Sequence, residues 1–424
     1  MDRIANEGAR FSNAFSTTAL CSPARASYLS GLYAHTHGVI NNFTDFPHNL
    51  PSYPRQLQAA GYETAYIGKF HMGEQFDDPR PGFDYWASHK GQGEYYDTTF
   101  NINGDRQVLK GYYTHRVTEL AVGWLKKPRQ RPFMLAMGHK APHMLCIPEP
   151  EYEHTFDNAA IELPPTANDI GVGKPSWIKE SVGTWHGLKG PLYGSKDYAD
   201  FIHRYLGTIL SIDDSLGELY ETLRASGELD NTVFVHAADH GFLIGEHGRV
   251  DKRVMYEESI RVPLIVRYPE LIRQPTVVSQ TVLNIDFAPS LLDVCGVEPL
   301  PKTHGQSWKS FLADAAKPGR DSWYYEYNYE EQFPYTPNVR GIRTSDWKYI
   351  HYPNGDEERD KYTAELYNLR VDPHETRNLV GVQSDRAQSL HTEMVRLQQM
   401  TNALPDRMPI NPEMKMVLPD QKIR

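Results

Sequence analysis

The sequence predicts an α/β protein with a mainly parallel sheet sandwiched between helices, followed by a small C-terminal α+β subdomain. Segments with apolar residues at helical spacing alternate with short apolar runs, which is the pattern of βαβ units. Past residue 318, aromatic strand-like segments separated by turns replace this alternation. We therefore divide the chain into a first part, residues 1–318, and a second part, residues 319–424, which we expect to be an antiparallel sheet with a terminal helix.

The helices and strands follow in order from these patterns. We expect helices over residues 1–7, 22–30, 54–60, 113–127, 199–225 and 286–294, several of which end beside a glycine that can adopt the left-handed cap conformation. We expect strands over 64–67, 132–137, 232–237 and 262–268, and in the second part strands over 323–329, 339–352 and 366–369 before an amphipathic helix over 384–400. Residues 152–195 form a loop-rich insertion that we expect to shape a pocket.

The start of the second helix is marked by Ser22 and Pro23, which fit the N-cap and the first helical position. This interpretation places Cys21 just ahead of a helix N-terminus. Cys146 and Cys295 are the other two cysteines of the chain, too few and too scattered for a disulfide framework, and we expect both to be structural.

Composition excludes some classes of function. The 424 residues carry 54 acidic and 44 basic side chains, a net charge of −10, which argues against nucleic-acid binding because a phosphate-tracking surface needs a basic excess. No apolar run approaches the roughly 18 residues of a membrane-spanning helix, and no segment fits a signal peptide. We therefore expect neither a nucleic-acid partner nor a membrane span.

Three of the predicted strands end in polar clusters. The first is followed by Lys69 and His71, the second by His139, Lys140 and His143, and the third by Asp239 and His240. In open α/β sheets, ligands bind outside the carboxyl ends of the strands. We therefore expect these side chains to converge on one pocket.

The segment Cys21-Ser22-Pro23-Ala24-Arg25, with Gly31 downstream, fits the pattern C-x-P-x-R. It resembles the signature of the type I sulfatases, members of the alkaline phosphatase-like superfamily, in which this cysteine is oxidised to formylglycine. Further segments resemble that family in order and spacing over nearly the whole chain: residues 68–73 (GKFHMG), 139–143 (HKAPH), 239–241 (DHG) with Lys252, and 372–379 (DPHETRNL).

The resemblance implies hydrolysis of sulfate esters, with a sulfated carbohydrate or an aryl sulfate as substrate. This reaction needs an oxygen nucleophile, positive charge at the sulfate oxygens and a proton for the leaving alcohol. By resemblance, formylglycine made from Cys21 by a formylglycine-generating enzyme supplies the nucleophile, and Arg25 steadies it. The other catalytic residues that the resemblance implies are Lys69 and Lys252 on the sulfate oxygens, His71 orienting the nucleophile and His143 donating the proton.

The resemblance also implies a calcium ion, held by Asp239, His240 and the modified residue 21. Calcium prefers oxygen ligands, which leaves open that His240 contacts sulfate or suits another metal. The family's opening strand, which carries two adjacent acidic metal ligands, would precede the helix that starts at Met1. We therefore expect a truncated member whose catalytic domain lacks its first strand, and, since relatives are commonly exported, a periplasmic or extracellular location.

Segments 80–84 (RPGFD) and 333–337 (FPYTP) resemble bacterial glycan sulfatases and N-acetylglucosamine-6-sulfatases, so we expect a sulfated glycan as substrate. Two alternatives stay open at this point. One is a phosphonate or phosphate-ester hydrolase of the same superfamily. The other is a catalytically inactive homologue that acts as a binding protein.

Overall fold

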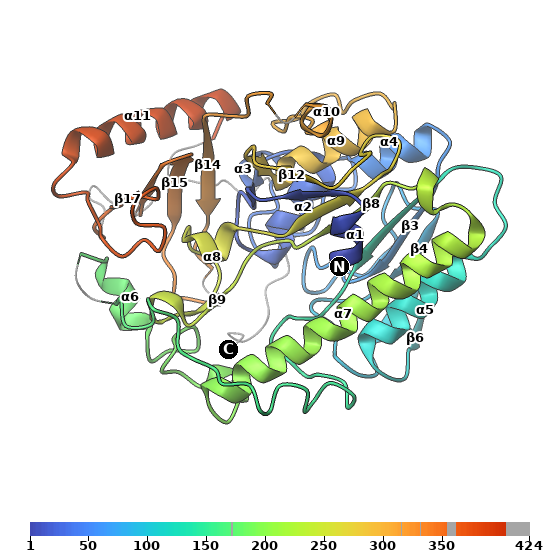
Figure 1. The fold of residues 1–424 in the computed structure, drawn as a ribbon, viewed down its shortest axis with the longest axis horizontal. Coiled ribbons are helices and arrows are strands. Elements are labelled where there is room, and N and C mark those ends of the chain that lie inside the picture. The colour runs from blue at the N-terminus through green and yellow to red at the C-terminus, as the bar shows by residue number, and fades with distance from the viewer. Residues whose placement is uncertain (171–172, 315, 331, 354–361, 404–424) are drawn as a thin grey trace.

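The computed structural model describes residues 1–170, 173–314, 316–330, 332–353 and 362–403, and it has the expected α/β architecture (Figure 1). The predicted elements of the first part all form, with ends that differ by a few residues. The second part, as far as it is described, is an antiparallel sheet with a long final helix. The last residues of the second part, 404–424, lie outside the described residues.

The first part contains two mixed sheets where the sequence predicted one mainly parallel sheet. One sheet has the order β6-β5-β4-β3-β7, and the other has the order β12-β1-β11-β8. The strands of the first are β3 (Glu63–Gly68), β4 (Tyr85–Ser88), β5 (Thr99–Ile102), β6 (Asp105–Val108) and β7 (Phe133–Gly138). Those of the second are β1 (Ala9–Phe11), β8 (Phe234–Ala237), β11 (Leu264–Arg267) and β12 (Thr276–Val278).

Only part of each sheet is parallel. In the first sheet, β4 and β7 run parallel to β3, whereas β5 and β6 form a hairpin across the two-residue turn Asn103-Gly104. Both turn residues have positive φ, 51° and 106°, which Asn and Gly tolerate best. In the second sheet, β11 is antiparallel to both of its neighbours, β1 and β8. The prediction of a mainly parallel sheet is therefore right for the centre of the first sheet and wrong for the second.

The two sheets face each other at the edges of β7 and β8. Within the described part of the chain, β7 pairs only with β3, and β8 pairs only with β11. A cavity of about 1420 Å³ is lined by residues of both strands and extends to the polar residues that follow them. The expectation that the catalytic part lacks its first strand stays a prediction.

Helices cover both faces of the first sheet. On one face, α5 (Tyr113–Leu125) and α7 (Tyr198–Ser226) lie side by side (Figure 1), joined by a 2.6 Å hydrogen bond between the hydroxyls of Thr118 and Ser215. On the other face lie α2 (Cys21–Ser30), α4 (Tyr53–Ala59) and α9 (Phe287–Val294). Strand β3 alternates between the two cores: Ala65 and Ile67 pack towards α5 and α7, and Tyr66 packs towards α2 and α4.

The smaller elements connect this framework. They are α1 (Asp2–Asn6), β2 (Ala14–Phe15), α3 (Ala34–His37), α6 (Ser176–Ser181), β9 (Leu243–Ile244), β10 (Val250–Asp251), α8 (Glu257–Ile260), β13 (Val282–Leu283) and α10 (Lys309–Ala313). No helix among the described residues has both the length and the apolarity that crossing a bilayer requires.

The second part forms the sheet β14-β15-β16-β17, antiparallel throughout. Its strands are β14 (Ser322–Tyr327), β15 (Val339–Thr344), β16 (Trp347–His351) and β17 (Glu365–Asn368), so the single strand expected over 339–352 is a hairpin. Helix α11 (Ser384–Thr401) lies along this sheet (Figure 1). One buried cluster contains Leu20 and Tyr256 of the first part together with Tyr325 and Leu366 of the second, so the two parts share a core.

The N-cap and the first residue of helix α2 each lie two positions earlier than predicted. Its N-cap is Leu20, Cys21 is its first residue, and it ends at Gly31, whose φ is 70°. Ser22 is therefore inside the helix, and its hydroxyl donates a 2.5 Å hydrogen bond to the carbonyl oxygen of His71 instead of capping. The prediction that Cys21 lies just ahead of the helix is corrected: Cys21 is the first helical residue, and the Ser22 hydroxyl that was expected to cap the helix makes a tertiary hydrogen bond instead.

Glycines at the ends of β3 and β7 let these strands approach the active-site helix. A Cβ atom on Gly68 would lie 2.2 Å from the carbonyl oxygen of Gly138. A Cβ atom on Gly138 would lie 2.3 Å from the carbonyl oxygen of Lys69 and 3.0 Å from Nη1 of Arg25. Because the nearest of these atoms belong to backbone, a side chain here would force the strand ends apart.

We predict that Gly138→Ala lowers the free energy of unfolding by about 1–3 kcal/mol, the usual cost of overpacking. Gly123→Ala is the control, because it lies in α5 with nothing within 4 Å of a Cβ atom, and it is expected to stabilise the protein by up to about 1 kcal/mol. Urea unfolding measures both. Equal effects of the two substitutions would show that the close approach at Gly138 does not constrain the fold.

Candidate active site

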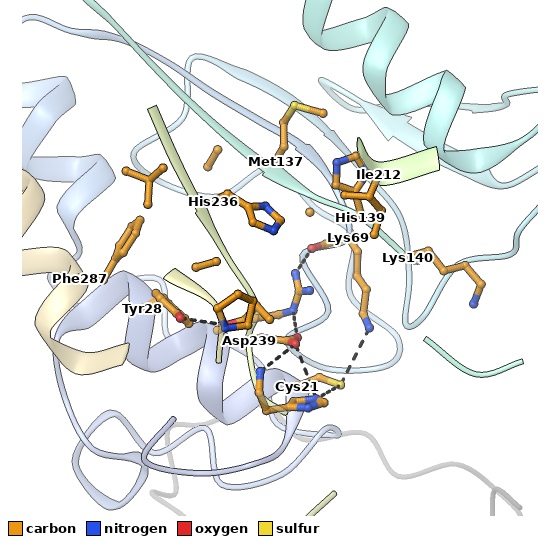
Figure 2. Close-up of a pocket in the computed structure, with 18 of the residues that line it drawn as sticks. Cys21, Tyr28, Lys69, Met137, His139, Lys140, Ile212, His236, Asp239 and Phe287 are labelled. Atoms are coloured by element: carbon orange, nitrogen blue, oxygen red, sulfur yellow. Dashed lines mark hydrogen bonds and ion pairs between the residues drawn. The ribbon is translucent and has the colours of Figure 1, made fainter. Parts of the chain in front are cut away.

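The sulfur atom of Cys21 lies among positively charged and imidazole groups from distant segments. Its Sγ is 3.3 Å from Nε2 of His240, 3.5 Å from Nζ of Lys252 and 4.0 Å from Nζ of Lys69. Figure 2 shows Lys69 reaching towards Cys21 from one side, with Asp239 beside them. The thiol stands where the oxygens of a formylglycine would be, so the same groups would face those oxygens.

This arrangement changes the acidity of the Cys21 thiol. Burial would raise its pKa, since the side chain is 1% exposed. The charges of Lys252 and Lys69 outweigh burial and, with His240 and a hydrogen bond to His143, hold the pKa of Cys21 well below its ordinary value. The position therefore favours a negatively charged group.

Arg25 lies one turn along α2 and is held by two oxygen acceptors. Its Nε donates a 2.9 Å hydrogen bond to Oδ2 of Asp239, and Nη1 donates to the carbonyl oxygen of Lys69. Burial would raise the pKa of Asp239, but His240 and Arg25 hold it well below its ordinary value. The ion pair with Asp239 fixes the guanidinium of Arg25 in place beside residue 21.

Lys69 and Lys252, the two lysines whose ammonium groups contact Cys21, are buried, 2% and 6% exposed. Burial lowers the pKa of Lys69 to about 8, although the negative charge of Cys21 opposes the shift. Lys140 is also buried, its pKa lowered to about 8 by the same cause, and its ammonium lies 5.0 Å from the centre of the Tyr95 ring. Buried ammonium groups of this kind favour an anionic ligand.

The two histidines nearest Cys21 are both oriented by backbone carbonyls. Nδ1 of His240 is 2.7 Å from the carbonyl oxygen of Gly241, and Nδ1 of His143 is 2.5 Å from that of Met144. A carbonyl oxygen only accepts, so Nδ1 carries a proton in each ring. Burial and the charge of Lys69 hold the pKa of His143 well below its ordinary value.

His71, another predicted catalytic residue, is held by two polar side chains. Its ring is fully buried and pairs with Oε1 of Glu74 at 2.8 Å and with Nε2 of Gln92 at 3.2 Å. The backbone carbonyl oxygen of His71 accepts a hydrogen bond from the Ser22 hydroxyl, and this bond connects His71 to the start of α2. Its role as an orienting group stays a prediction.

The cavity beside Cys21 brings together the polar clusters that follow the three predicted strands, as expected. Its lining includes Lys69, His139, Lys140, His143, Asp239 and His240. Figure 2 shows that His139 lies with His236 at a distance from Cys21, towards the part of the cavity between β7 and β8. Of the second cluster, His143 is the residue that forms a hydrogen bond with Cys21.

Sequence reasoning missed several residues of this cavity. Glu74 and Gln92 line it and hold His71, and the aromatic side chains of Trp185, Tyr193 and Phe333 line another wall. Glu74 lies only three residues after His71, and this short spacing could have indicated that the two side chains pair. Phe333 lies in the segment 333–337 that suggested a glycan substrate, and residues 185 and 193 lie in the loop-rich insertion expected to shape a pocket.

The expected calcium ligands are only partly suited to that ion. Ligand atoms of Cys21, Asp239 and His240 lie within 4.8 Å of one another. The set offers one carboxylate, already paired with Arg25, whereas calcium takes six to eight oxygen ligands. These three residues alone do not fit calcium, and we derive no step of the reaction through a metal.

The fold and the site define a hydrolase of the alkaline phosphatase-like superfamily, built around a buried anion-binding position. The family model "Sulfatase" matches residues 1–297, and the model "N-sulphoglucosamine sulphohydrolase, C-terminal" matches residues 245–402. The chain is 33% identical to the N-acetylglucosamine-6-O-sulfatase of Bacteroides thetaiotaomicron, over 90% of this chain and 78% of that protein. The chain belongs to the sulfatase family, whose members hydrolyse sulfate esters.

A solved structure agrees over almost the whole chain. It is described as a complex with its substrate D-glucosamine-2-N,6-O-disulfate, and it matches with a TM-score of 0.88 and 32% identity over 96% of this chain and 93% of its own. The relatives include an extracellular sulfatase, the SULF-1 homologue of Drosophila melanogaster, 30% identical over 74% of this chain and 29% of that protein. Sulfatases of this family generally use a formylglycine and a divalent metal.

We predict that, in unmodified protein, Cys21 is the only cysteine that is a thiolate at pH 7. Its pKa is lowered, so its thiolate persists as the pH falls below the ordinary thiol range near 8.5. Burial raises the pKa of Cys146 to about 12 and raises that of Cys295. Ultraviolet thiolate absorbance at pH 7 should vanish in Cys21→Ser, decrease in Lys252→Met and stay unchanged in Cys146→Ser. A signal that persists in Cys21→Ser would contradict the charge balance described here.

Proposed function

We propose that this sulfatase removes a sulfate ester from a sulfated glycan through a formylglycine formed from Cys21. The observation that carries the proposal is the convergence of Lys69, Lys252 and His240 on the side chain of residue 21, at the first turn of a helix. A tetrahedral sulfate placed there would face two ammonium groups and the positive end of the helix dipole.

Each residue has a task that follows from its contacts. Residue 21 would hold the nucleophile, and as a hydrated formylglycine it would supply two hydroxyl groups, one for attack on sulfur and one for release of the sulfate. Lys69 and Lys252 neutralise the non-bridging oxygens, which gain charge in the transition state. Arg25 cannot swing into the pocket because Asp239 and the Lys69 carbonyl hold it, so it fixes the geometry around residue 21.

His143 is the best-placed donor for the leaving alcohol among the residues that contact position 21. Without an anion beside it, the ring is neutral, because burial and Lys69 lower its pKa. A bound sulfate places negative charge next to the ring and raises that pKa, which gives Nε2 the proton that it donates. The bound sulfate ester would thus protonate His143 indirectly, by raising its pKa, and the protonated ring would act as the general acid for the leaving alcohol.

We propose a glucosamine residue with a 6-O-sulfate as the preferred substrate. The names of the relatives support this choice, since one is an N-acetylglucosamine-6-O-sulfatase and one structure is a complex with a glucosamine 2-N,6-O-disulfate. Trp185, Tyr193 and Phe333 line the cavity, and the Phe333 ring already stacks with His186 and lies under the guanidinium of Arg253. An aromatic side chain of the cavity would pack against the apolar face of a sugar ring.

The remaining expectations are part of the same proposal. Maturation of Cys21 requires a formylglycine-generating enzyme as a partner. Asp239 and His240 are proposed as protein ligands of a divalent cation, and calcium stays an expectation of the family resemblance. A periplasmic or extracellular location agrees with the extracellular relative. A division of the chain near residue 318 agrees with the separate sheet that starts at β14.

The test uses protein produced together with a formylglycine-generating enzyme, with the modification of residue 21 verified by peptide mass spectrometry. We expect release of inorganic sulfate from N-acetylglucosamine-6-sulfate. Cys21→Ala should lower kcat at least about a thousandfold, because it removes the nucleophile. Cys146→Ala is the matched control and should leave turnover unchanged, since that thiol has a raised pKa and no place in the reaction.

Two outcomes would overturn the proposal. Faster hydrolysis of a phenyl phosphonate or phosphate than of every sulfate ester tested would favour the phosphonate or phosphate-ester hydrolase. Binding of the sulfated sugar without turnover, by protein with verified formylglycine, would favour the binding protein.

A further inference from the structure

A second cluster of potential metal ligands lies apart from Cys21, where the first part of the chain meets the C-terminal sheet. It consists of His247, Glu258 and Glu375, whose ligand atoms lie within 4.8 Å of one another. His247 lies in the short 3₁₀ turn Glu246–Gly248, Glu258 in α8 (Glu257–Ile260), and Glu375 in the turn that follows β17. Each of three separate segments therefore contributes one side chain to the cluster.

The imidazole of His247 is held in one orientation. Its Nδ1 is 3.2 Å from Oδ2 of Asp169, and its ring stacks on Tyr256 with the ring centres 4.1 Å apart. Because the carboxylate accepts, Nδ1 carries the proton and Nε2 carries a lone pair. Nε2 is buried without a hydrogen-bond partner, in a side chain that is 0% exposed. An acceptor this deeply buried calls for a partner.

The groups facing that lone pair are acceptors too. Oε2 of Glu258 is buried and has no hydrogen-bond partner among the described residues. Glu375 is 0% exposed, and its carboxylate takes a hydrogen bond from the backbone nitrogen of Glu257 and an ion pair with Lys348 at 2.7 Å. Lys348 is shared, because Oε1 of Glu257 lies 2.8 Å from the same ammonium.

We propose that His247, Glu258 and Glu375 form a zinc site with an open fourth position for water. One imidazole nitrogen and two carboxylates are a ligand set that zinc uses, whereas calcium takes oxygen ligands. Zinc bonds are about 2.0–2.2 Å long, so the ligand atoms would close to roughly 3–4 Å from one another. Asp169 has the place of the carboxylate that orients a zinc-bound histidine.

The position of the site indicates a structural function. Glu258 also lines the large cavity, which gives an ion a path from outside. The loop that carries His247 leads directly into β10 and Lys252, one of the two ammonium groups at Cys21. A bound ion would fasten this loop to the turn that holds Glu375, and so would fix the position of Lys252.

In the experiment, full-length protein is first freed of metal and then dialysed against zinc chloride. The zinc retained per chain is measured by elemental mass spectrometry. Cys21→Ser serves as the parent protein, because it removes the thiol ligand from the other candidate cluster, which contains Cys21, Asp239 and His240. We expect the parent to retain one zinc ion per chain. In that background, His247→Asn should lose it, and Asp169→Asn should bind it about 10–100-fold more weakly. Asn is chosen at position 247 because the backbone there has a φ of 51°.

The control is His154→Asn, which removes a histidine that is 77% exposed and paired with Asp157. It should keep the full zinc content. Zinc should also raise the Tm of the parent protein and of His154→Asn but leave that of His247→Asn unchanged, a readout that does not depend on turnover.

Equal zinc content in the parent and in His247→Asn would overturn the proposal, and so would a parent that retains no zinc. In the second case a proton shared between the carboxylates and Nε2 would be the occupant. Should His247→Asn fail to fold, anomalous diffraction at the zinc edge on crystals of the parent protein decides the question. A peak between His247, Glu258 and Glu375 supports the site, and its absence there overturns it.

Discussion

Arg25, Lys69 and Lys252 surround the side chain of residue 21, and Asp239 is the carboxylate that pairs with the first of them. Burying a cation is unfavourable unless a negative charge compensates it. The two lysines have this compensation from residue 21 itself, or from a ligand bound beside it. The excess of positive charge lowers the pKa of Cys21, burial lowers that of Lys69, and both effects favour an anion in the pocket.

The fold supplies this charge cluster from segments that are far apart in the sequence. Lys69 is 48 residues from Cys21, and Lys252 is 231 residues from it. Gly68 and Gly138 allow the ends of β3 and β7 to come close together. At this position the carbonyl oxygen of Lys69 accepts a hydrogen bond from Arg25. The zinc site that we propose would act on the same cluster, because it would hold the loop that leads to Lys252.

Much of this could be predicted from the sequence. Local signals were sufficient for the helices, since apolar spacing and terminal glycines are encoded within each segment, and the family motifs located Cys21, Lys69, Asp239 and Lys252. Pairing between strands was harder, because short apolar runs do not specify partners. The second sheet was therefore predicted as parallel, and the Asn103-Gly104 hairpin was overlooked although its turn residues are characteristic. The burial of His71 against Glu74 and Gln92, and the convergence of His247, Glu258 and Glu375, depend on tertiary contacts that no local pattern shows.

Binding of inorganic sulfate to the Cys21→Ser protein, measured by calorimetry, tests the charge cluster most directly. We expect sulfate to bind while Lys69 is protonated and its affinity to fall as the pH rises through the pKa of Lys69, which burial lowers from its ordinary value. Lys69→Ala and Lys252→Ala should each weaken binding about tenfold or more, as the loss of a hydrogen bond to a charged group implies. Lys110→Ala, at a lysine that is 78% exposed, should not weaken it. Sulfate affinity that is unchanged in both active-site variants would contradict the account.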